Sequence, residues 1–305
     1  MANTLHILNG NSTLAIFNQS GIEGDTFVWH EVLCEGPVQF DITTYSFWEV
    51  RSEFMCNYFE TTQQGFDEKV IQPFRKLEAL INNYEEIVLW FEYDLFCQVN
   101  MIALISWLNQ IECGQVSLIC VGRFDGQKKL LGLGEIQASE YPQLLQKRVK
   151  LNTREFTHAQ DAWESYCSTY ADDIYNFILL KMEEFQYLPD AFDAHLKRFP
   201  SSATGLNEIE QKILDLYLGG FKEDHKIVGE MLRWQQFLGF GDLQYFNVVS
   251  YLRPLLKLVD QSAEIPGKED VELLLDRDYA LGGANASNWV WDENEKALIP
   301  IESMP

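Results

Sequence analysis

Basic residues are scarce in this sequence. Its 305 residues include 23 lysines and arginines against 46 aspartates and glutamates, so the formal net charge is −23. No basic run is longer than the pairs Lys128–Lys129 and Lys147–Arg148. A surface of this charge repels the phosphates of nucleic acids and the headgroups of anionic membranes. The composition therefore predicts that the protein binds neither nucleic acid nor a membrane surface.

Several signatures of established chemistry are also missing. The sequence contains no Walker loop, no GxGxxG fingerprint, no GxSxG nucleophile elbow and no HxH or HExxH metal motif. The cysteines form no CxxC pair and no tight cluster, which predicts reduced thiols rather than disulfides or a structural zinc. They are Cys34, Cys56, Cys97, Cys113, Cys120 and Cys167.

Long apolar stretches are absent as well. The first residues, MANTLHILNG, have neither the basic start nor the apolar core of a signal peptide, and no run of eighteen apolar residues occurs. These observations predict a cytoplasmic protein. Hydrophobic residues make up 47% of the chain, so a chain of this length can bury one or two cores of ordinary size.

Short apolar runs alternate with helical periodicity in the first third of the chain. This alternation is typical of a parallel sheet with helices on both faces. Asn11 or Ser12 is predicted to cap the first helix, and Pro73 marks a break or kink in a later one. The predicted strands are Thr4–Leu8, Thr26–Trp29, Glu86–Phe91 and Val116–Val121, and the predicted helices include Leu14–Phe17, Phe47–Tyr58, Phe66–Asn83 and an amphipathic helix over Phe96–Leu108.

Helical periodicity dominates after about residue 135. Near the end, Val271–Leu275 and Asn288–Trp291 are predicted to form the strands of a hairpin. We therefore predict a Rossmann-like α/β domain over residues 1–135 and a mainly helical domain with a terminal hairpin over residues 136–305. Helices followed by a hairpin are also typical of a winged helix, but the acidity of this half favours a structural or protein-contact role over DNA reading.

Each predicted strand of the sheet is followed by polar residues. In open parallel sheets, ligands sit beyond the carboxyl ends of the strands, where the strand order reverses. If the four strands are parallel, these side chains share one rim, which is the strongest functional indication in the sequence. The residues are Asn9, Asn11 and Ser12 after the first strand, His30 and Glu31 after the second, Glu92 and Asp94 after the third, and Arg123 and Asp125 after the fourth.

Glu92 and Asp94 form the most suggestive pair on this rim. Because they lie two residues apart in an extended chain, their side chains leave the same face. There they can hold a divalent cation such as Mg²⁺ or act as acid and base, with Glu31 as a third carboxylate. The structural alternative is that Asp94 caps the following helix while Glu92 is merely solvated. The sequence leaves these alternatives open.

Other candidates on the rim each have a commoner structural explanation. The turn Asn9–Ser12 can present backbone N–H groups to an anion, but an ordinary capped turn is more frequent. His6 is a candidate general base, although a buried structural histidine is more common inside a strand. Trp29 can stack on a base or sugar ring, or serve as a core aromatic. Cys97 is either a nucleophile or a small buried side chain.

Four strings of residues carry a resemblance to a known family: LHILNGNST at Leu5–Thr13, VWHEVLCEGPV at Val28–Val38, LWFEYDLFCQ at Leu89–Gln98 and FPSSATGLNEIEQKIL at Phe199–Leu214. The first three resemble the N-terminal domain of the bacterial family catalogued as domain of unknown function 1835. The fourth, with FLGFGD at Phe237–Asp242, resembles the helical part that commonly follows that domain. The family has no established activity, so the resemblance implies an architecture and shared positions rather than a reaction.

The resemblance also implies which positions matter. An Asp is usual in the family where this chain has Asn11, a His where it has Tyr93, and an Asp where it has Cys97, which implies altered or impaired chemistry here. Gln98 is also a ligand-binding candidate, because it agrees with the family at its position. The positions that agree are His6, Asn9, Gly10, Ser12, Trp29, Glu31, Gly36, Pro37, Glu92, Asp94 and Gln98.

Two functions of different classes follow. In the first, the N-terminal domain binds a small anionic ligand, nucleotide- or phosphate-like, at the rim, with hydrolysis or transfer assisted by a divalent metal. Its catalytic candidates are Asp94, Glu92, Glu31 and His6. In the second, the protein is a non-enzymatic regulator or adaptor whose helical half contacts another protein. The sequence does not separate them.

Overall fold

The computed structural model describes residues 3–262 and 265–301, which fold into two compact units. The chain passes between the units several times rather than once. The first unit comprises the chain up to Cys34, Val38–Glu164 and Lys181–Leu188, and the second comprises Glu35–Pro37, Ser165–Leu180 and the chain from Pro189 onward.

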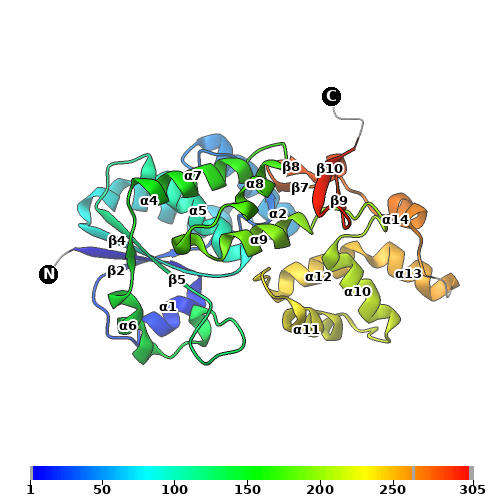
Figure 1. Ribbon diagram of the computed structural model, residues 1–305, viewed down its shortest axis with the longest axis horizontal. Coiled ribbons are helices and arrows are strands. Elements are labelled where there is room, and N and C mark those ends of the chain that lie inside the picture. Colours follow the sequence, from blue (N-terminus) through cyan, green and yellow to red (C-terminus); the bar gives the residue numbers. More distant parts are fainter. Residues whose placement is uncertain (1–2, 263–264, 302–305) are drawn as a thin grey trace. The chain divides into compact units, whose positions relative to one another are not determined.

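A five-stranded sheet forms the centre of the first unit (Figure 1). The strands are β1 (Thr4–Asn9), β2 (Asp25–Trp29), β4 (Glu86–Glu92), β5 (Gln115–Val121) and β6 (Val149–Lys150). They lie in the order β2-β1-β4-β5-β6, and all neighbours are parallel except β5 and β6. The prediction of a mixed α/β protein with a mostly parallel sheet is confirmed. The short antiparallel strand β6 was not predicted.

Burial on both faces explains the near-continuous apolar runs of the central strands. In β4 every residue from Ile87 to Phe91 is buried, because helices cover both sides of the sheet. On one face Trp90 packs with Phe17 of α1 (Asn11–Phe17) and Tyr141 of α6 (Tyr141–Gln146). Helices α4 (Gln72–Leu80), α5 (Leu95–Asn109) and α7 (Thr153–Tyr166) lie on the opposite face (Figure 1).

Helix α5 (Leu95–Asn109) differs from the prediction. The sequence predicted an amphipathic helix, but every residue from Cys97 to Leu108 is buried. The reason is that a further layer covers this helix on the side away from the sheet. Phe74 of α4 (Gln72–Leu80) packs its ring 5.0 Å from that of Trp107. The polar side chains of α5 are therefore buried, and they need hydrogen-bond partners inside the protein.

The predicted cap of α1 was wrong. Gly10, rather than Asn11 or Ser12, occupies the N-cap position, and no side chain caps the helix. Gly10 has a φ of +99°, which only glycine adopts readily, so the backbone itself makes the turn. Pro73 behaves as predicted, because a π-helical turn interrupts the helix just before the first turn of α4.

The remaining elements of the first unit connect these layers. They are α2 (Tyr45–Tyr58), α3 (Gln63–Phe66), the π-helical turn Asp67–Ile71, short 3-10 turns at Ile81–Asn83, Leu133–Glu135, Ala138–Glu140 and Glu183–Phe185, and α7 (Thr153–Tyr166), whose last residues belong to the second unit. Within residues 3–262 and 265–301, no helix combines the length and the apolarity that a membrane crossing requires.

The second unit is mainly helical and carries two small sheets. The predicted terminal hairpin is confirmed, but it joins β9 (Trp289–Asp292) to β10 (Ala297–Pro300). A second sheet contains β3 (Gly36–Pro37), β7 (Ala280–Gly282) and β8 (Ala284–Asn285). The helices are α8 (Asp173–Leu179), α9 (Leu188–Leu196), α10 (Glu208–Leu218), α11 (Asp224–Trp234), α12 (Asp242–Tyr251), α13 (Arg253–Ser262) and α14 (Lys268–Leu274), and a 3-10 turn spans Ala286–Asn288.

Val271–Leu275, predicted as a hairpin strand, instead lies in and just after α14. The Gly267 N–H donates to the Asp270 carboxylate at the start of this helix, which satisfies a backbone donor. Val271 is 1% exposed and Leu273 83% exposed, so the run buries one face with helical spacing. The helical periodicity predicted after residue 135 is found over residues 243–258 as two helices, α12 and α13.

A short piece of the N-terminal chain completes the second unit. Strand β3 pairs in parallel with β7, with Gly36 opposite Leu281. Just before it, the Glu35 carboxylate accepts a hydrogen bond from Arg198 at 2.6 Å and another from Gln244 at 3.0 Å. Both members of the Glu35–Arg198 pair are buried. A fragment that begins at residue 136 therefore lacks the partner of a buried guanidinium.

Replacing Glu35 with Ala should destabilise the second unit by about 3–5 kcal/mol, because Arg198 would stay buried without its counter-charge. Urea unfolding monitored by tryptophan fluorescence measures the change. Glu272→Ala is the matched control, because its ion pair with Lys268 is exposed on α14 and should cost less than about 1 kcal/mol. Equal effects of the two substitutions would contradict this account of the buried pair.

Candidate functional site

The strand order creates a reversal next to β1. From β1 the chain moves to β2 on one side, then crosses to β4 on the other side of β1. Ligands of open parallel sheets bind beyond the carboxyl ends of the strands at such a reversal. Here those ends are Asn9 of β1 and Glu92 of β4, and both belong to the predicted rim.

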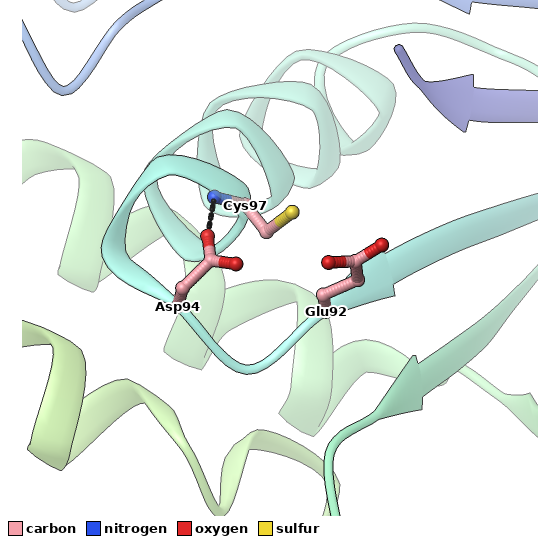
Figure 2. Close-up of side chains that lie close together, drawn as sticks. All are labelled: Glu92, Asp94 and Cys97. Atoms are coloured by element: carbon pink, nitrogen blue, oxygen red, sulfur yellow. Dashed lines mark hydrogen bonds between the residues drawn. The ribbon is translucent and has the colours of Figure 1, made fainter. Parts of the chain in front are cut away.

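Three potential metal ligands meet at this point. One ligand atom from each of Glu92, Asp94 and Cys97 lies within 4.8 Å of the others. Figure 2 shows that the three side chains point toward a common space between the end of β4 and the first turn of α5. Asp94 and Cys97 are buried, and Glu92 is partly exposed.

The start of α5 fixes two of these side chains. The Asp94 carboxylate accepts the Cys97 backbone N–H at 2.8 Å, so Asp94 caps the helix as one alternative predicted (Figure 2). The cap occupies Oδ1 and leaves the second oxygen for another partner. Since residues three apart lie on one side of a helix turn, the cap also brings the Cys97 thiol beside the carboxylate.

Glu92 is held by the loop that follows β5. Its Oε1 accepts the backbone N–H of Leu133 at 2.8 Å. A Cβ added to Gly132 would overlap with the Glu92 carboxylate, so the absence of a side chain there makes room for it. Both residues belong to the segment Gly132–Glu135, which the sequence analysis did not connect with the site.

When no cation is present, burial and mutual repulsion raise the pKa values of the acidic groups in this site. Burial, and then the charge of Asp94, raise the pKa of Glu92 to about 7. Burial raises the pKa of Asp94 to about 6 and holds that of the Cys97 thiol well above its usual value. Burial and the charge of Asp94 also raise the pKa of Tyr93 to about 12. Carboxyls with raised pKa values in one cluster are typical of functional sites.

Asn9 connects the end of β1 to the same cluster. Its Nδ2 donates to Cys97 Sγ at 2.9 Å, and its Oδ1 accepts from Asn100 Nδ2 at 2.9 Å. Asn100 also donates to the Glu31 carbonyl at 2.9 Å and accepts the Leu33 N–H at 3.3 Å. Asn9 was a predicted site residue, whereas Asn100 was missed. An asparagine between the apolar residues Val99 and Met101 of α5 was the available signal.

The Glu31 carboxylate is not part of the cluster. Both of its oxygens bind Arg51, at 3.1 and 2.9 Å, and both side chains are fully buried. Arg51 also donates to the Val32 carbonyl. The Val32 N–H also donates to Glu31 Oε2 at 2.8 Å, and the completely buried carboxylate is out of reach of a ligand. We therefore leave Glu31 outside the site and assign it to the packing of the first unit.

His6 and Trp29 lie in the core. His6 is 1% exposed, accepts the Trp90 indole N–H on Nδ1 and contacts the Glu23 carbonyl through Nε2. Burial lowers its pKa. Because Nδ1 accepts the indole N–H, that nitrogen carries no proton and the ring is neutral. Trp29 packs edge-on against Phe74, with 5.7 Å between ring centroids. The structure places neither side chain beside Glu92 and Asp94.

The other predicted residues lie around the cluster or at the surface. Asn11 and Ser12 are exposed, and His30 Nε2 lies 3.2 Å from Asn11 Oδ1. Gln98 is buried, donates to the Glu92 carbonyl at 2.6 Å, and has no partner for Oε1 within the described part of the chain. Arg123 and Asp125 are exposed.

Comparison with known proteins adds no family to this picture. The chain matches no protein-family model, and no curated protein matches it with significance. The geometry of the site must therefore carry the functional argument.

Glu92→Gln should flatten part of the pH dependence of stability. The folded protein holds a proton on Glu92 that the unfolded chain releases, because its pKa rises from 4.5 to about 7. The resulting stabilisation is present below about pH 4 and is lost as pH rises through 7. Wild type should therefore lose about 2–3 kcal/mol more than Glu92→Gln between pH 4.5 and 7.5.

Urea unfolding at several pH values measures this difference. Asp125→Asn, which changes an exposed carboxylate in the loop after β5, should follow the wild-type curve. Parallel curves for Glu92→Gln and wild type would show that this carboxyl does not hold the proton.

Proposed function

We propose that the first unit is a Rossmann-like domain that binds a small anionic, phosphate-containing ligand through a divalent cation. The cation would bind at Glu92 and Asp94, and the ligand would lie at the reversal between β1 and β4. The convergence of Glu92, Asp94 and Cys97 within 4.8 Å is the observation that carries this proposal. The position of the cluster beyond the carboxyl ends of parallel strands supports it.

A cation is needed because the cluster is acidic. Two carboxylates and a nearby phosphate repel one another, and the repulsion is strong where the surroundings are buried. A divalent cation reverses the sign of the interaction, because it binds carboxylate oxygens on one side and phosphate oxygens on the other. This is why the ligand and the cation are proposed together.

The turn at the start of α1 borders the same space. The 3-10 turn Leu133–Glu135 binds Glu92 through Leu133, and a Cβ at Gly134 would lie 3.8 Å from that of Ser12. Open space surrounds the position of a Cβ at Gly10. Asn11 and Ser12, which are exposed, are therefore close enough to the carboxylates to contact a ligand that the cation holds.

Hydrolysis or group transfer is the natural extension of this binding. A divalent cation would supply Lewis-acid activation of the phosphate.

We also propose that the chain is related to the family called domain of unknown function 1835. Two of the strings that carry this resemblance, Leu5–Thr13 and Leu89–Gln98, contain Asn9, Glu92 and Asp94.

The cation should be required for phosphate binding. We expect inorganic phosphate to raise the melting temperature of the full chain in the presence of MnCl₂ and to leave it unchanged without a cation. Saturation at a hundred times the Kd is worth about 2.7 kcal/mol. Glu92→Gln and Asp94→Asn should abolish the effect, and Asn at position 94 retains the helix cap. Asp125→Asn should behave as wild type.

Two outcomes would contradict the proposal. Phosphate that stabilises the protein equally without a cation would place the anion elsewhere. A melting temperature that no divalent cation changes would show that Glu92 and Asp94 bind no cation.

A second candidate function is that of an adaptor, and a groove in the second unit favours it. The groove has a volume of about 850 Å³, lies along α9, α10 and the β9–β10 hairpin, and includes the aromatic side chains of Phe199, Trp234 and Trp291. Its size is that of a binding cleft. Phe199 and Trp291 are buried, whereas Trp234 is partly exposed, and tryptophan is enriched where proteins bind partners. The helices and hairpin could also belong to a winged-helix-like fold, as the sequence suggested.

Trp234→Ala tests the adaptor function. Affinity capture from cells, with quantitative mass spectrometry, should recover one stoichiometric partner with wild type and lose it with Trp234→Ala. Glu92→Gln should retain the partner, because the first unit takes no part in this contact. Leu273→Ala, which alters another exposed apolar residue of the second unit, is the control and should also retain it. Retention by Trp234→Ala would rule out the groove.

A further inference from the structure

We infer that the cation of this site is a thiophilic one of the zinc class, bound by Glu92, Asp94 and the Cys97 thiolate, with Asn9 as a positioning residue. The inference rests on the proposed cation site and specifies which metal it takes. It differs from the expectation of Mg²⁺ that the carboxylates alone suggested.

The donor set favours zinc over magnesium. Mg²⁺ demands octahedral oxygen coordination and has little affinity for sulfur. Zn²⁺ accepts cysteine, aspartate and glutamate together, and three protein ligands leave a fourth tetrahedral position for water or substrate. Glu92, Asp94 and Cys97 offer such a set of two carboxylates and one thiol.

The hydrogen bonds around Asn9 direct its amino group at the Cys97 sulfur, which accepts a hydrogen bond from it. The Leu33 backbone N–H can only donate, so the atom of Asn100 that it contacts is the oxygen. The Glu31 carbonyl can only accept, so it faces the Asn100 amino group. These two contacts fix the orientation of the Asn100 amide without ambiguity.

The orientation of Asn100 then fixes that of Asn9. The Asn100 amino group also faces Asn9, so the atom of Asn9 on that side is its oxygen. The Asn9 amino group is therefore turned toward Cys97 Sγ, at 2.9 Å. An N–H group directed at sulfur stabilises a thiolate and orients it, as outer-shell partners do for metal ligands. The backbone of the loop after β2 thus sets the donor that faces the thiol.

Charge makes a cation necessary for the thiolate form. Cys97 and Asp94 are 4% and 7% exposed, and a thiolate beside two carboxylates would place three negative charges in a buried space. A divalent cation compensates two of them. When the sulfur–metal bond forms, the thiol proton leaves to bulk solvent. The site therefore holds a neutral thiol without metal and a thiolate ligand with metal.

Cobalt(II) tests this assignment because it substitutes for zinc and reports sulfur ligation by its colour. We expect Co²⁺ added to the full chain to give a near-ultraviolet sulfur-to-cobalt charge-transfer band and the visible bands of a tetrahedral site. One equivalent of Zn²⁺ should abolish the spectrum, whereas a thousandfold excess of Mg²⁺ over Co²⁺ should leave it unchanged. Cys97→Ser should lose the charge-transfer band, and Cys113→Ser, which changes a cysteine outside the cluster, should keep it.

Two further variants probe the surroundings of the metal. Asn9→Ala should weaken Co²⁺ binding by about 10–100-fold and shift the charge-transfer band to longer wavelength, because the thiolate loses its N–H donor. Gly132→Ala should weaken binding while the protein stays folded, because the added methyl group displaces only the flexible end of Glu92. Circular dichroism establishes that each variant is folded.

The outcomes separate this inference from the proposed function. Stabilisation by Mn²⁺ or Mg²⁺, with a cobalt spectrum that lacks the charge-transfer band, would overturn the thiolate assignment and leave the cation-dependent site in place. A charge-transfer band without any effect of phosphate would support the thiolate site and contradict the anion-binding function. Loss of the band in Cys113→Ser, or its persistence in Cys97→Ser, would place the metal on another cysteine.

Discussion

Asp94 accepts the Cys97 backbone N–H while it is buried between the end of β4 and the first turn of α5. This contact ends the strand, begins the helix, and places a carboxylate and a thiol side by side. Because α5 is covered on all sides and Asp94 itself is buried, solvent does little to stabilise the charge of this carboxylate. The site therefore has to compensate that charge by a proton or by a cation. Without a cation, the raised pKa values of Asp94 and Glu92 favour the protonated carboxyls.

Two groups of buried polar side chains in the first unit satisfy their charges and hydrogen bonds in different ways. Glu31 and Arg51 neutralise each other completely and leave nothing for a ligand. Asn9 and Asn100 are neutral amides. Backbone groups fix the orientation of Asn100, Asn100 fixes that of Asn9, and the Asn9 amino group then donates to Cys97. The first arrangement holds the segment after β2 in place, and the second uses that segment to orient a side chain of the site. A stable ion pair and a cluster able to bind a ligand thus lie within one short stretch of structure.

The two units are not two consecutive stretches of the sequence. Glu35 and strand β3 come from the N-terminal part of the chain but complete the buried charges and a small sheet of the second unit. No periodicity could reveal this, because a two-residue strand has no pattern and Glu35 resembles any other acidic residue. The same limit applies to β6, which is also two residues long.

The sequence by itself determined the parallel strands, because strands buried on both faces must be continuously apolar, and it placed polar residues at their ends. It also offered the helix cap at Asp94. Only the tertiary structure decided the strand order, the full burial of α5, and which rim residues meet. His6, Trp29 and Glu31 carry the same local signals as Asn9 and Glu92, yet they pack into the core or into an ion pair. That choice depends on neighbours distant in sequence, such as Trp90, Phe74 and Arg51, which local pattern does not encode.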